Sequence, residues 1–369
     1  MATDKKLFTA FSRRDLLKSL AGVPILGAVW AAGIDTTKKS KLEKDFWLEK
    51  LNIKASAPPA SGPMSGNPLR IGLIGFGIRG EQLMRALGFA TQEWMESMAK
   101  SAQEDPNDKR LEDFLAQENL NVKLTAICDI FDVRAEKALR SFNTESNPCK
   151  RYENYLDLIH SGEVDAIIIA TPDHWHAPAA ILASSAGKHV YLEKPCSHNP
   201  HEGELLIEAV KKYKNVIQMG NQRRSWPNVA AGIREVHNGA IGKPYFAKTW
   251  YTNNRAPIGI GKEVAVPNWL NFDLWQGPAP RRVYKDNILH YNWHWFWHWG
   301  TGEALNNGTH FVDLARWGLQ VEYPTRVTSV GGRFAHKDDW QTPDTQTIGL
   351  EFGNNSMITW EGRSCNGMK

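Results

Sequence analysis

The sequence predicts an α/β protein with an N-terminal Rossmann domain, a doubly wound parallel sheet, followed by a C-terminal α+β domain built on a largely antiparallel sheet. From residue 69 to about residue 221, short apolar segments alternate with helical patterns, which is typical of βαβ units. The first apolar segment leads directly into GFGIRG, a glycine turn followed by an amphipathic helix. Beyond residue 243, segments alternate apolar and polar residues, as antiparallel strands with one solvated face do.

Composition supports two packed domains and excludes several classes of protein. The chain has 369 residues, of which 42% are hydrophobic and 23% are charged, so it can bury two cores. A net charge of +4 is too small to indicate a nucleic-acid partner. The four cysteines, at positions 128, 149, 196 and 365, show no disulfide framework spacing, so we expect stability to come from the core.

The first 66 residues are not expected to belong to either domain. Residues 1–34 resemble a twin-arginine export signal, with SRRDLLK at 12–18 and a short apolar run over 20–33. We therefore expect a periplasmic protein, with weak membrane anchoring if the segment is kept. Residues 35–66 are charged and then rich in Ala, Pro, Ser and Gly, which predicts an extended arm.

Residues 67–221 carry the predicted Rossmann domain. After the glycine helix, a charged segment at 92–118 looks like an insertion that delays the second strand. The expected order after it is strand 121–129, helices 132–146 and 153–161, strand 164–170, helix 177–187, strand 188–195, helix 201–213 and strand 215–221.

Residues 222–369 form the predicted second domain, for substrate binding and oligomerisation. Its expected strands alternate apolar and polar residues and lie at 244–253, 326–334, 345–353 and 356–363. Residues 364–369 follow the last strand with no closing element, so we expect the domain to be incomplete at its C-terminus.

Candidate cofactor-binding residues stand where strands end, because the carboxyl ends of parallel strands face the ligand crevice. Asp129 ends the second strand, where a carboxylate would bind a ribose hydroxyl and repel a 2′-phosphate, so it favours NAD. Nearby Arg134 keeps NADP open as the alternative. The expected cofactor contacts are Gly75, Gly77, Ile78, Arg79, Gly80, Asp129, Thr171, Pro172, Asp173, His176, Glu193 and Lys194.

Four motifs together resemble the Gfo/Idh/MocA family of nicotinamide-dependent sugar and cyclitol oxidoreductases: GFGIRG, ATPDHWH, LEKP and GTHFVDLARW. The resemblance covers roughly residues 67–369. It implies that Lys194 lies between the nicotinamide and the reacting hydroxyl and that His310 serves as acid/base. Better-known members of the family place an aspartate four residues before this histidine, whereas this chain has Asn306. An amide can orient His310 but cannot stabilise an imidazolium, so Lys194 and His310 both stay open as the base.

Candidate substrate contacts come from both domains. Asn306, His310 and Asp313 fall at i, i+4 and i+7 of a predicted helix and would share one face. Trp175 and His176 follow the fourth strand, although a capping or packing role for His176 is the alternative. The expected substrate-binding residues are Trp175, His176, Asn306, Asp313 and Trp297.

Residues 291–302 read YNWHWFWHWGTG, with a tryptophan at every second position from 293 to 299. As an extended segment, the stretch would place the four indoles on one face and His294, Phe296 and His298 on the other. As a helix, it would align His290, His294 and His298 at a metal-ligand spacing, but aromatic crowding and the closing glycines favour the extended form, so no metal is predicted. We expect a substrate platform or lid, with at least two tryptophans packing; a buried aromatic plug is the alternative.

The function expected from these residues and this resemblance is oxidation of a sugar, glycoside or cyclitol hydroxyl by NAD, with a small carbohydrate as partner. An exported enzyme would need its cofactor loaded before export and held tightly, which predicts a redox-neutral cycle. In the family, glucose-fructose oxidoreductase, whose N-terminal arm packs over its cofactor, and NAD-dependent glycosidases offer such cycles. An NAD-dependent glycosidase and a non-catalytic carbohydrate-binding protein are the alternatives. A homo-oligomer is expected by analogy with the family.

Overall fold

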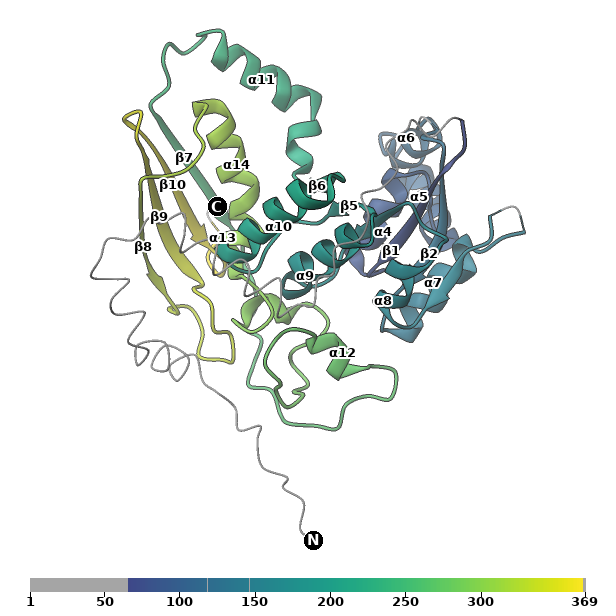
Figure 1. Cartoon of the computed structure of the whole chain (residues 1–369). Coiled ribbons are helices and arrows are strands. Elements are labelled where there is room, and N and C mark those ends of the chain that lie inside the picture. The colour runs from purple at the N-terminus through teal and green to yellow at the C-terminus, as the bar shows by residue number, and fades with distance from the viewer. Residues whose placement is uncertain (1–65, 118, 146, 368–369) are drawn as a thin grey trace. The chain divides into compact units, whose positions relative to one another are not determined.

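Six parallel strands form the first sheet, in the order β3-β2-β1-β4-β5-β6 (Figure 1). The strands are β1 (Leu69–Ile74), β2 (Val122–Cys128), β3 (Lys150–Tyr152), β4 (Ala166–Ile169), β5 (His189–Leu192) and β6 (Ile217–Met219). Strand order reverses between β1 and β4, and the crevice at such a reversal is where open α/β sheets bind ligands. The predicted doubly wound parallel sheet is confirmed.

This computed structural model describes residues 66–117, 119–145 and 147–367. The chain divides into two units, 1–54 and 55–369, and all described residues belong to the second. The predicted export signal and all but the last residue of the predicted arm therefore lie outside the described residues. Within the described part, no helix is both long and apolar enough to cross a membrane.

The helices of the first domain connect its strands, and right-handed crossovers running outward in both directions from β1 place them on both faces of the sheet. They are α4 (Ile78–Ala86), α5 (Gln92–Glu104), α6 (Arg110–Leu115), α7 (Asp132–Phe142), α8 (Tyr155–His160), α9 (Asp173–Ser185) and α10 (Pro200–Tyr213). Local sequence starts several of them: the Asn199 side chain accepts a hydrogen bond from the Glu202 backbone N–H at 3.1 Å, with Pro200 in the first turn. Helices α5 and α6 occupy the predicted charged insertion.

Helix α9 begins earlier than the sequence suggested. The predicted helix began at residue 177. In the structure the helix begins at Asp173, one residue after Pro172, and Pro178 lies inside it. Asp173 places a negative charge in the first turn, where it interacts favourably with the helix dipole. Trp175 and His176 therefore lie at the start of a helix rather than before it.

Strand β1 and its neighbours supply the core of the first domain. Leu73, Met84, Leu124 and Ile127 are fully buried and pack with Phe142 from α7. Each fully buried side chain of this kind contributes roughly 1.5–3 kcal/mol of hydrophobic stabilisation. The strand ends that carry the functional turns are therefore held by a rigid apolar layer.

Four strands form the second sheet, in the order β7-β10-β9-β8. They are β7 (Phe246–Thr252), β8 (Arg326–Gly332), β9 (Thr345–Phe352) and β10 (Ser356–Arg363). Strands β8, β9 and β10 pair antiparallel, while β7 pairs parallel with β10. The predicted largely antiparallel sheet is confirmed, with one parallel pair. The remaining elements are η1 (Gln222–Ser225), α11 (Pro227–His237), α12 (Phe272–Gln276), η2 (Asn292–Trp295), α13 (Gly302–Asn306) and α14 (Gly308–Leu319).

Helix α14 covers one face of the second sheet (Figure 1). Ala315 and Leu319 of α14 pack against Phe352 of β9 and Ile358 of β10. Along β10, buried side chains such as that of Ile358 alternate with partly buried ones. This packing fixes α14, and with it His310, relative to the sheet.

The tryptophan-rich stretch is not extended, so the predicted common face of four indoles is wrong. It forms the short 3₁₀ helix η2 and then successive turns: the N–H of Phe296 donates to the Trp293 carbonyl at 3.2 Å, and that of Trp299 donates to the Phe296 carbonyl at 3.0 Å. Trp295, Phe296 and Trp299 are buried, whereas Trp297 is 50% exposed. The turns bring Trp295, Phe296 and Trp299, which are spaced by three and four residues, to the buried side. Their burial outweighs the extended geometry that the alternating pattern favours.

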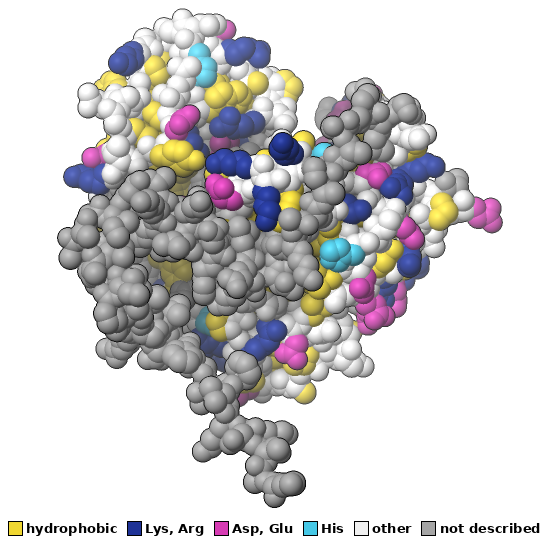
Figure 2. Space-filling view, viewed as in Figure 1, with side chains coloured by type: hydrophobic (Ala, Val, Ile, Leu, Met, Phe, Trp, Pro, Cys, Tyr) yellow, Lys and Arg dark blue, Asp and Glu magenta, His cyan; other side chains and the backbone are white. Residues whose placement is uncertain are grey.

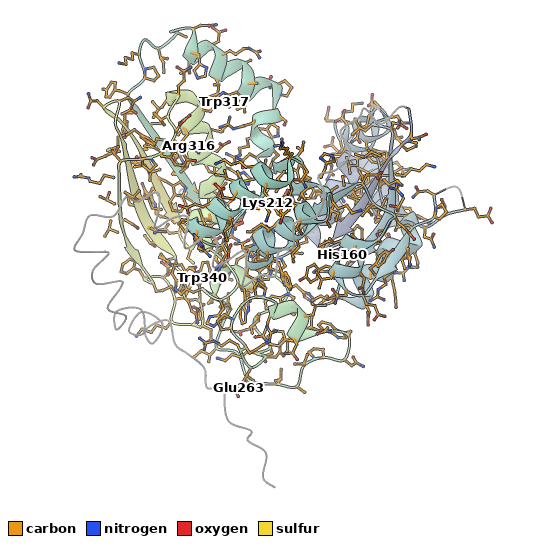
Figure 3. The ribbon with its side chains drawn as sticks, in the orientation of Figure 1. His160, Lys212, Glu263, Arg316, Trp317 and Trp340 are labelled. Atoms are coloured by element: carbon orange, nitrogen blue, oxygen red, sulfur yellow. The ribbon has the colours of Figure 1, made fainter. Side chains whose placement is uncertain are left out.

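Trp295 is part of a stack that anchors this stretch to the second domain. Its ring lies parallel to that of Trp340 at 3.9 Å between centroids, and Trp340 lies near the lower end of the four-stranded sheet in the view of Figure 3. The guanidinium of Arg255 lies 4.8 Å from the Trp295 ring, and that of Arg333 lies 4.9 Å from the Trp340 ring. Two cation–π contacts therefore enclose the pair.

Side chains of both charge signs are interspersed over the described part of the surface that Figure 2 displays. This mixed surface agrees with the small net charge of +4.

Candidate active site

The glycine turn between β1 and α4 uses each of its glycines differently. Gly75 has a φ of +92°, and a Cβ there would lie 2.7 Å from the Ala170 carbonyl oxygen of the neighbouring strand end. A Cβ on Gly80 would overlap the Gly75 carbonyl oxygen, so Gly80 allows α4 to pack tightly. A Cβ on Gly77 would meet only the Arg134 guanidinium, at 3.3 Å. These are the requirements of a tight turn, close helix packing and backbone approach to a pyrophosphate.

Asp129 lies beside this turn and is buried. Its Oδ2 accepts a hydrogen bond from the Phe76 N–H at 2.7 Å, and its Oδ1 accepts one from the Phe131 N–H at 2.8 Å. Burial raises the pKa of the Asp129 carboxyl, and the two backbone N–H groups oppose that rise. Each carboxylate oxygen has a further lone pair, so Asp129 can still accept hydrogen bonds from ribose hydroxyls.

A cavity of about 330 Å³ opens along the strand ends and is lined by both domains. Of the predicted cofactor contacts, all but Gly80 line it: Gly75, Gly77, Ile78, Arg79, Asp129, Thr171, Pro172, Asp173, His176, Glu193 and Lys194. Trp175 and Asn306, predicted as substrate contacts, also line it, as does Arg134. Gly80 does not line the cavity; it packs against the Gly75 carbonyl oxygen within the turn.

Lys194 follows β5 and reaches across the cavity to the second domain. Its Nζ donates to the backbone carbonyl of Asn306 at 2.9 Å and to the Asn306 Oδ1 at 3.0 Å. Burial lowers the pKa of the Lys194 amine, while the carboxylates of Asp173 and Glu193 oppose that shift. A lysine with a lowered pKa can accept a proton at a lower pH than an ordinary lysine.

Glu193 and Arg79 connect the two turns that flank the cavity. Arg79 Nε donates to Glu193 Oε1 at 2.7 Å, and the Lys194 N–H donates to Glu193 Oε2 at 3.1 Å. Glu193 is buried, so this carboxylate holds the start of α4 against the backbone of Lys194.

Asn306 is itself held by a buried carboxylate, Glu303. The Asn306 Nδ2 lies 3.4 Å from Glu303 Oε1, and the Asn307 amide also donates to that oxygen. Glu303 Oε2 accepts from Arg255 Nε at 2.9 Å and from Ser364 Oγ at 3.2 Å. With Nδ2 directed to Glu303, the Asn306 Oδ1 faces Lys194. The carboxylate that the resemblance implies at position 306 is absent, but Glu303 provides a buried carboxylate three residues earlier.

His310 lies in the first turn of α14 and is buried, but it does not line the cavity. Burial lowers its pKa to about 4, and the charges of Lys194, Arg223 and Arg79 contribute to the shift. Its imidazole is therefore neutral at pH 7. Among the described residues its Nδ1 has no hydrogen-bond partner. A neutral imidazole with an unused nitrogen can accept or relay a proton.

His176 and Trp175 serve as links between the site's segments. The two ring nitrogens of His176 lie 2.8 Å from the Thr171 carbonyl oxygen and 2.5 Å from that of Pro195. Both nitrogens are occupied by backbone, which favours the packing alternative for His176 over direct binding of substrate. The Trp175 indole N–H donates to the Trp275 carbonyl at 2.9 Å, and its ring leaves a face on the cavity.

Two of the predicted substrate contacts lie away from the cavity. Asn306 ends α13 and α14 begins at Gly308, so the single helix expected to carry Asn306, His310 and Asp313 is broken. Asp313 accepts hydrogen bonds from Arg224 at 2.8 and 2.7 Å instead. Trp297 is turned to the surface, and neither residue is on the cavity lining. Both predictions relied on side-chain periodicity that the local turns interrupt.

His294 lines the cavity and was not predicted as a site residue. Its Nδ1 lies 2.6 Å from the Tyr291 carbonyl oxygen, so Nδ1–H donates and Nε2 remains an acceptor. The ring stacks on Trp293 at 3.6 Å between centroids, and burial lowers its pKa to about 4. The position of His294 within the aromatic stretch could have indicated a site residue. The predicted extended segment, however, placed His294 on the face opposite the tryptophans. Glu303 gave no sequence signal beyond its charge.

The cavity therefore combines a dinucleotide turn, a ribose-type carboxylate and a lysine with a lowered pKa, and its second wall is aromatic. Over the described residues, no group of three or more His, Cys, Asp and Glu side chains is placed to hold a metal ion. The residues present fit a nicotinamide dinucleotide, because Gly77 lets a pyrophosphate approach the backbone and Asp129 can accept hydrogen bonds from ribose hydroxyls.

Two family models match the chain. One, described as "Oxidoreductase family, NAD-binding Rossmann fold", matches residues 69–221. The other, described as "Oxidoreductase family, C-terminal alpha/beta domain", matches residues 242–363. Both models belong to one family, and the first identifies NAD as the cofactor of the first domain.

Similar proteins include enzymes of inositol and sugar metabolism. Inositol 2-dehydrogenase of Salmonella typhimurium (strain LT2) is 34% identical over 167 residues, 42% of this chain and 49% of that protein. A glycosyl hydrolase family 109 protein of Saccharopolyspora erythraea is 26% identical over 303 residues, 78% of this chain and 57% of that protein. The matches thus span about half the length of these curated relatives.

Among solved structures, levoglucosan dehydrogenase in complex with NADH and levoglucosan superposes with a TM-score of 0.56. It is 22% identical, and the match covers 81% of this chain and 68% of that one. At this identity the likeness shows the fold.

Proposed function

Because the chain belongs to the Gfo/Idh/MocA family of oxidoreductases, we propose that it oxidises a CH–OH group of a sugar, glycoside or cyclitol with NAD. One observation carries the proposal: the Lys194 amine, whose pKa is lowered, lies on the same cavity as the glycine turn and Asp129. The inositol and levoglucosan dehydrogenases among its relatives support a polyol or sugar substrate.

A bound NAD would supply the hydride acceptor, C4 of its nicotinamide ring. The chain's own residues must take the hydroxyl proton and position the reacting carbon. Lys194 lies on the cavity, and the two Asn306 oxygens at 2.9 and 3.0 Å orient its amine. The neutral Lys194 amine accepts the proton from the substrate hydroxyl as the hydride leaves the carbon, so that charge is balanced.

We assign Lys194 rather than His310 as the first proton acceptor. Lys194 lines the cavity, whereas His310 lies behind it and feels the Lys194 charge. Asn306 acts as a positioning residue for Lys194, and Glu303 orients Asn306 in turn.

A second candidate is a glycosidase that oxidises and re-reduces its substrate on retained NAD. The observation that favours it is the similarity to a glycosyl hydrolase family 109 protein across 78% of this chain. In such a cycle a retained NAD would take a hydride from the sugar and return it after the aglycone has left and water has added, so the net reaction would be hydrolysis and no NADH would accumulate. Glycoside cleavage without net change at 340 nm distinguishes this candidate from the first.

Export and assembly are part of the same proposal. The SRRDLLK motif at 12–18 supports twin-arginine export to the periplasm, which requires a cofactor loaded before export. Exposed Phe246 and Trp250 on β7 support a homo-oligomer formed through the second sheet. Fractionation of cells and light scattering of the purified protein test these two parts separately.

The experiment that tests the function is a substrate panel with purified protein and saturating NAD. Absorbance at 340 nm is followed with myo-inositol, levoglucosan, glucose and alkyl glucosides, and nitrophenyl glycosides report cleavage. NADH formation with a polyol or sugar supports the oxidoreductase, and cleavage without NADH supports the glycosidase. Sugar binding by calorimetry with neither reaction would leave the non-catalytic carbohydrate-binding alternative and overturn the proposal.

A further inference from the structure

Residues 267–300 form a separate layer on the cofactor cavity, which we call the roof. It contains α12 and η2 and has its own buried core of Leu270, Phe272, Trp275, Tyr284, Ile288, Phe296 and Trp299. Because these side chains pack on one another, the roof keeps its shape without help from a ligand. Its inner surface lines the cavity with Leu274, Trp275, Leu289, His290, Trp293 and His294.

The roof is attached to the first domain at the Asp129 end of the cavity. Leu270 forms an antiparallel bridge with Phe131, two residues after Asp129. The Phe131 ring lies 4.2 Å from the Trp269 ring and 4.8 Å from the His290 ring, between centroids. Trp269 and His290 are nearly parallel, with 17° between their planes. Aromatic contacts from both domains therefore meet where the adenosine half of a dinucleotide would lie.

A second attachment lies on the first turn of α9. The His174 N–H donates to the Trp299 carbonyl at 3.2 Å, and the His174 ring Nε2 lies 2.9 Å from the Trp275 carbonyl oxygen. The Trp175 indole N–H donates to the same Trp275 oxygen at 2.9 Å. His174 is buried, so these bonds are shielded from competing water.

From these two attachments we propose that the roof encloses the adenosine half of bound NAD and keeps it bound between turnovers, with Phe131 and His290 binding the adenine ring. Adenine offers a flat face to the Phe131 and His290 rings, and the Arg134 guanidinium lies 4.9 Å from the Phe131 ring on the first-domain side. Release of NAD then requires the roof to lift, which breaks the α9 hydrogen bonds and separates Phe131 from Trp269. This inference rests on the NAD-dependent function proposed above.

Trp269 is the residue whose removal should loosen the roof most selectively, because it packs behind His290 and is not on the cavity lining. Trp269→Ala removes the contact with Phe131 and leaves the glycine turn, Asp129 and Lys194 intact. Trp94→Ala is the matched control: Trp94 packs against Phe114 at 5.2 Å on the inserted helices, away from the cavity. His290→Ala, which changes the lining itself, is the second variant in case Trp269→Ala does not fold.

The test loads each purified protein with deuterated NAD, adds excess unlabelled NAD, and measures the label that remains bound by mass spectrometry over time. We expect the wild type and Trp94→Ala to release NAD over minutes or longer, and Trp269→Ala or His290→Ala to release it at least tenfold faster. Release from the wild type as fast as from both roof variants would overturn the inference while leaving NAD-dependent oxidation standing. Failure of the wild type to bind NAD would overturn both the inference and the proposed function.

Discussion

Replacement of Glu303 by glutamine tests whether the buried carboxylate behind Asn306 matters for the site. Glu303 is 3% exposed, and its two oxygens accept hydrogen bonds from Arg255, Ser364, Asn306 and Asn307. A glutamine of the same shape replaces one acceptor oxygen by an NH₂ donor. That donor would face other donors, and Arg255 would lose its counter-ion.

The expected loss of stability follows from this geometry. Breaking a buried ion pair by removing one partner costs roughly 3–5 kcal/mol. The lower end applies here, because the Arg255 side chain is 17% exposed and keeps its contact with the Trp295 ring at 4.8 Å. A loss of about 3 kcal/mol lowers the melting temperature by roughly 6–12 °C in a domain of about 150–250 residues.

Glu303→Gln should also change the pH dependence of turnover. The Glu303 charge is one of the influences that raise the pKa of Lys194 against the effect of burial. Without that charge the Lys194 pKa falls further, so its neutral form is present at lower pH. The acidic limb of the kcat profile therefore shifts to lower pH, while kcat at the plateau falls about tenfold or less because Asn306 is less well oriented.

Glu351→Gln provides the matched control. Glu351 pairs with Arg326 at 2.6 Å on the surface, with 40% and 67% of the two side chains exposed. Loss of such an exposed pair costs about 1 kcal/mol or less. Thermal unfolding and kcat measured from pH 5 to 10 give both readouts for each variant. If Glu303→Gln is as stable as Glu351→Gln and its pH profile matches the wild type, the reasoning about Glu303 is refuted.

Three further changes test the cofactor site, the glycine turn and the buried histidines. Asp129→Ala removes a charged hydrogen-bond acceptor and should weaken NAD binding roughly 10–100-fold, measured by quenching of tryptophan fluorescence; equal affinity would remove Asp129 from the cofactor site. Gly80→Ala places a methyl group on the Gly75 carbonyl oxygen and should cost about 1–3 kcal/mol in denaturant unfolding, whereas Gly162→Ala, with open space around it, serves as control. Acidification should destabilise the fold, because three histidines have pKa values lowered from 6.5 to about 4: His174, His294 and His310. Between those pH values the unfolded chain binds protons that the folded chain does not, so the free energy of unfolding falls by up to roughly 1.4 kcal/mol per pH unit for each histidine. Unfolding curves at pH 7 and pH 5 with the same midpoint would contradict this.

The sequence predicted the parts of this protein that short motifs specify. The glycine turn demands a positive φ at Gly75 and close packing at Gly80, and a strand followed by a helix provides both. Asp129 and Lys194 follow apolar strands, so their places at the strand ends could be predicted from the order of elements. Backbone requirements of this kind act over a few residues and are therefore visible in the sequence.

The second wall of the site depends on contacts between distant segments, which the sequence does not reveal. His174 meets the Trp275 carbonyl 101 residues later in the chain, and Arg255 meets Glu303 48 residues later. Periodicity also gave wrong predictions for residues 291–302, where a 3₁₀ helix and turns replace the expected extended segment. It assigned Trp297 to the cleft and His294 to the opposite face. Which of several aromatic residues faces the cavity is decided by packing, and packing requires the fold.

The role of Lys194 as proton acceptor is tested by a single-turnover measurement of NAD reduction in the wild type and in Lys194→Met. Both proteins are saturated with NAD, mixed with a polyol or sugar that the panel has shown to be oxidised, and followed at 340 nm. Loss of a general base typically slows the chemical step by about 10²–10⁴-fold, so we predict that NADH forms at least 100-fold more slowly in Lys194→Met. Equal rates in the two proteins would contradict the assignment of Lys194 as the proton acceptor and, with it, the proposed mechanism.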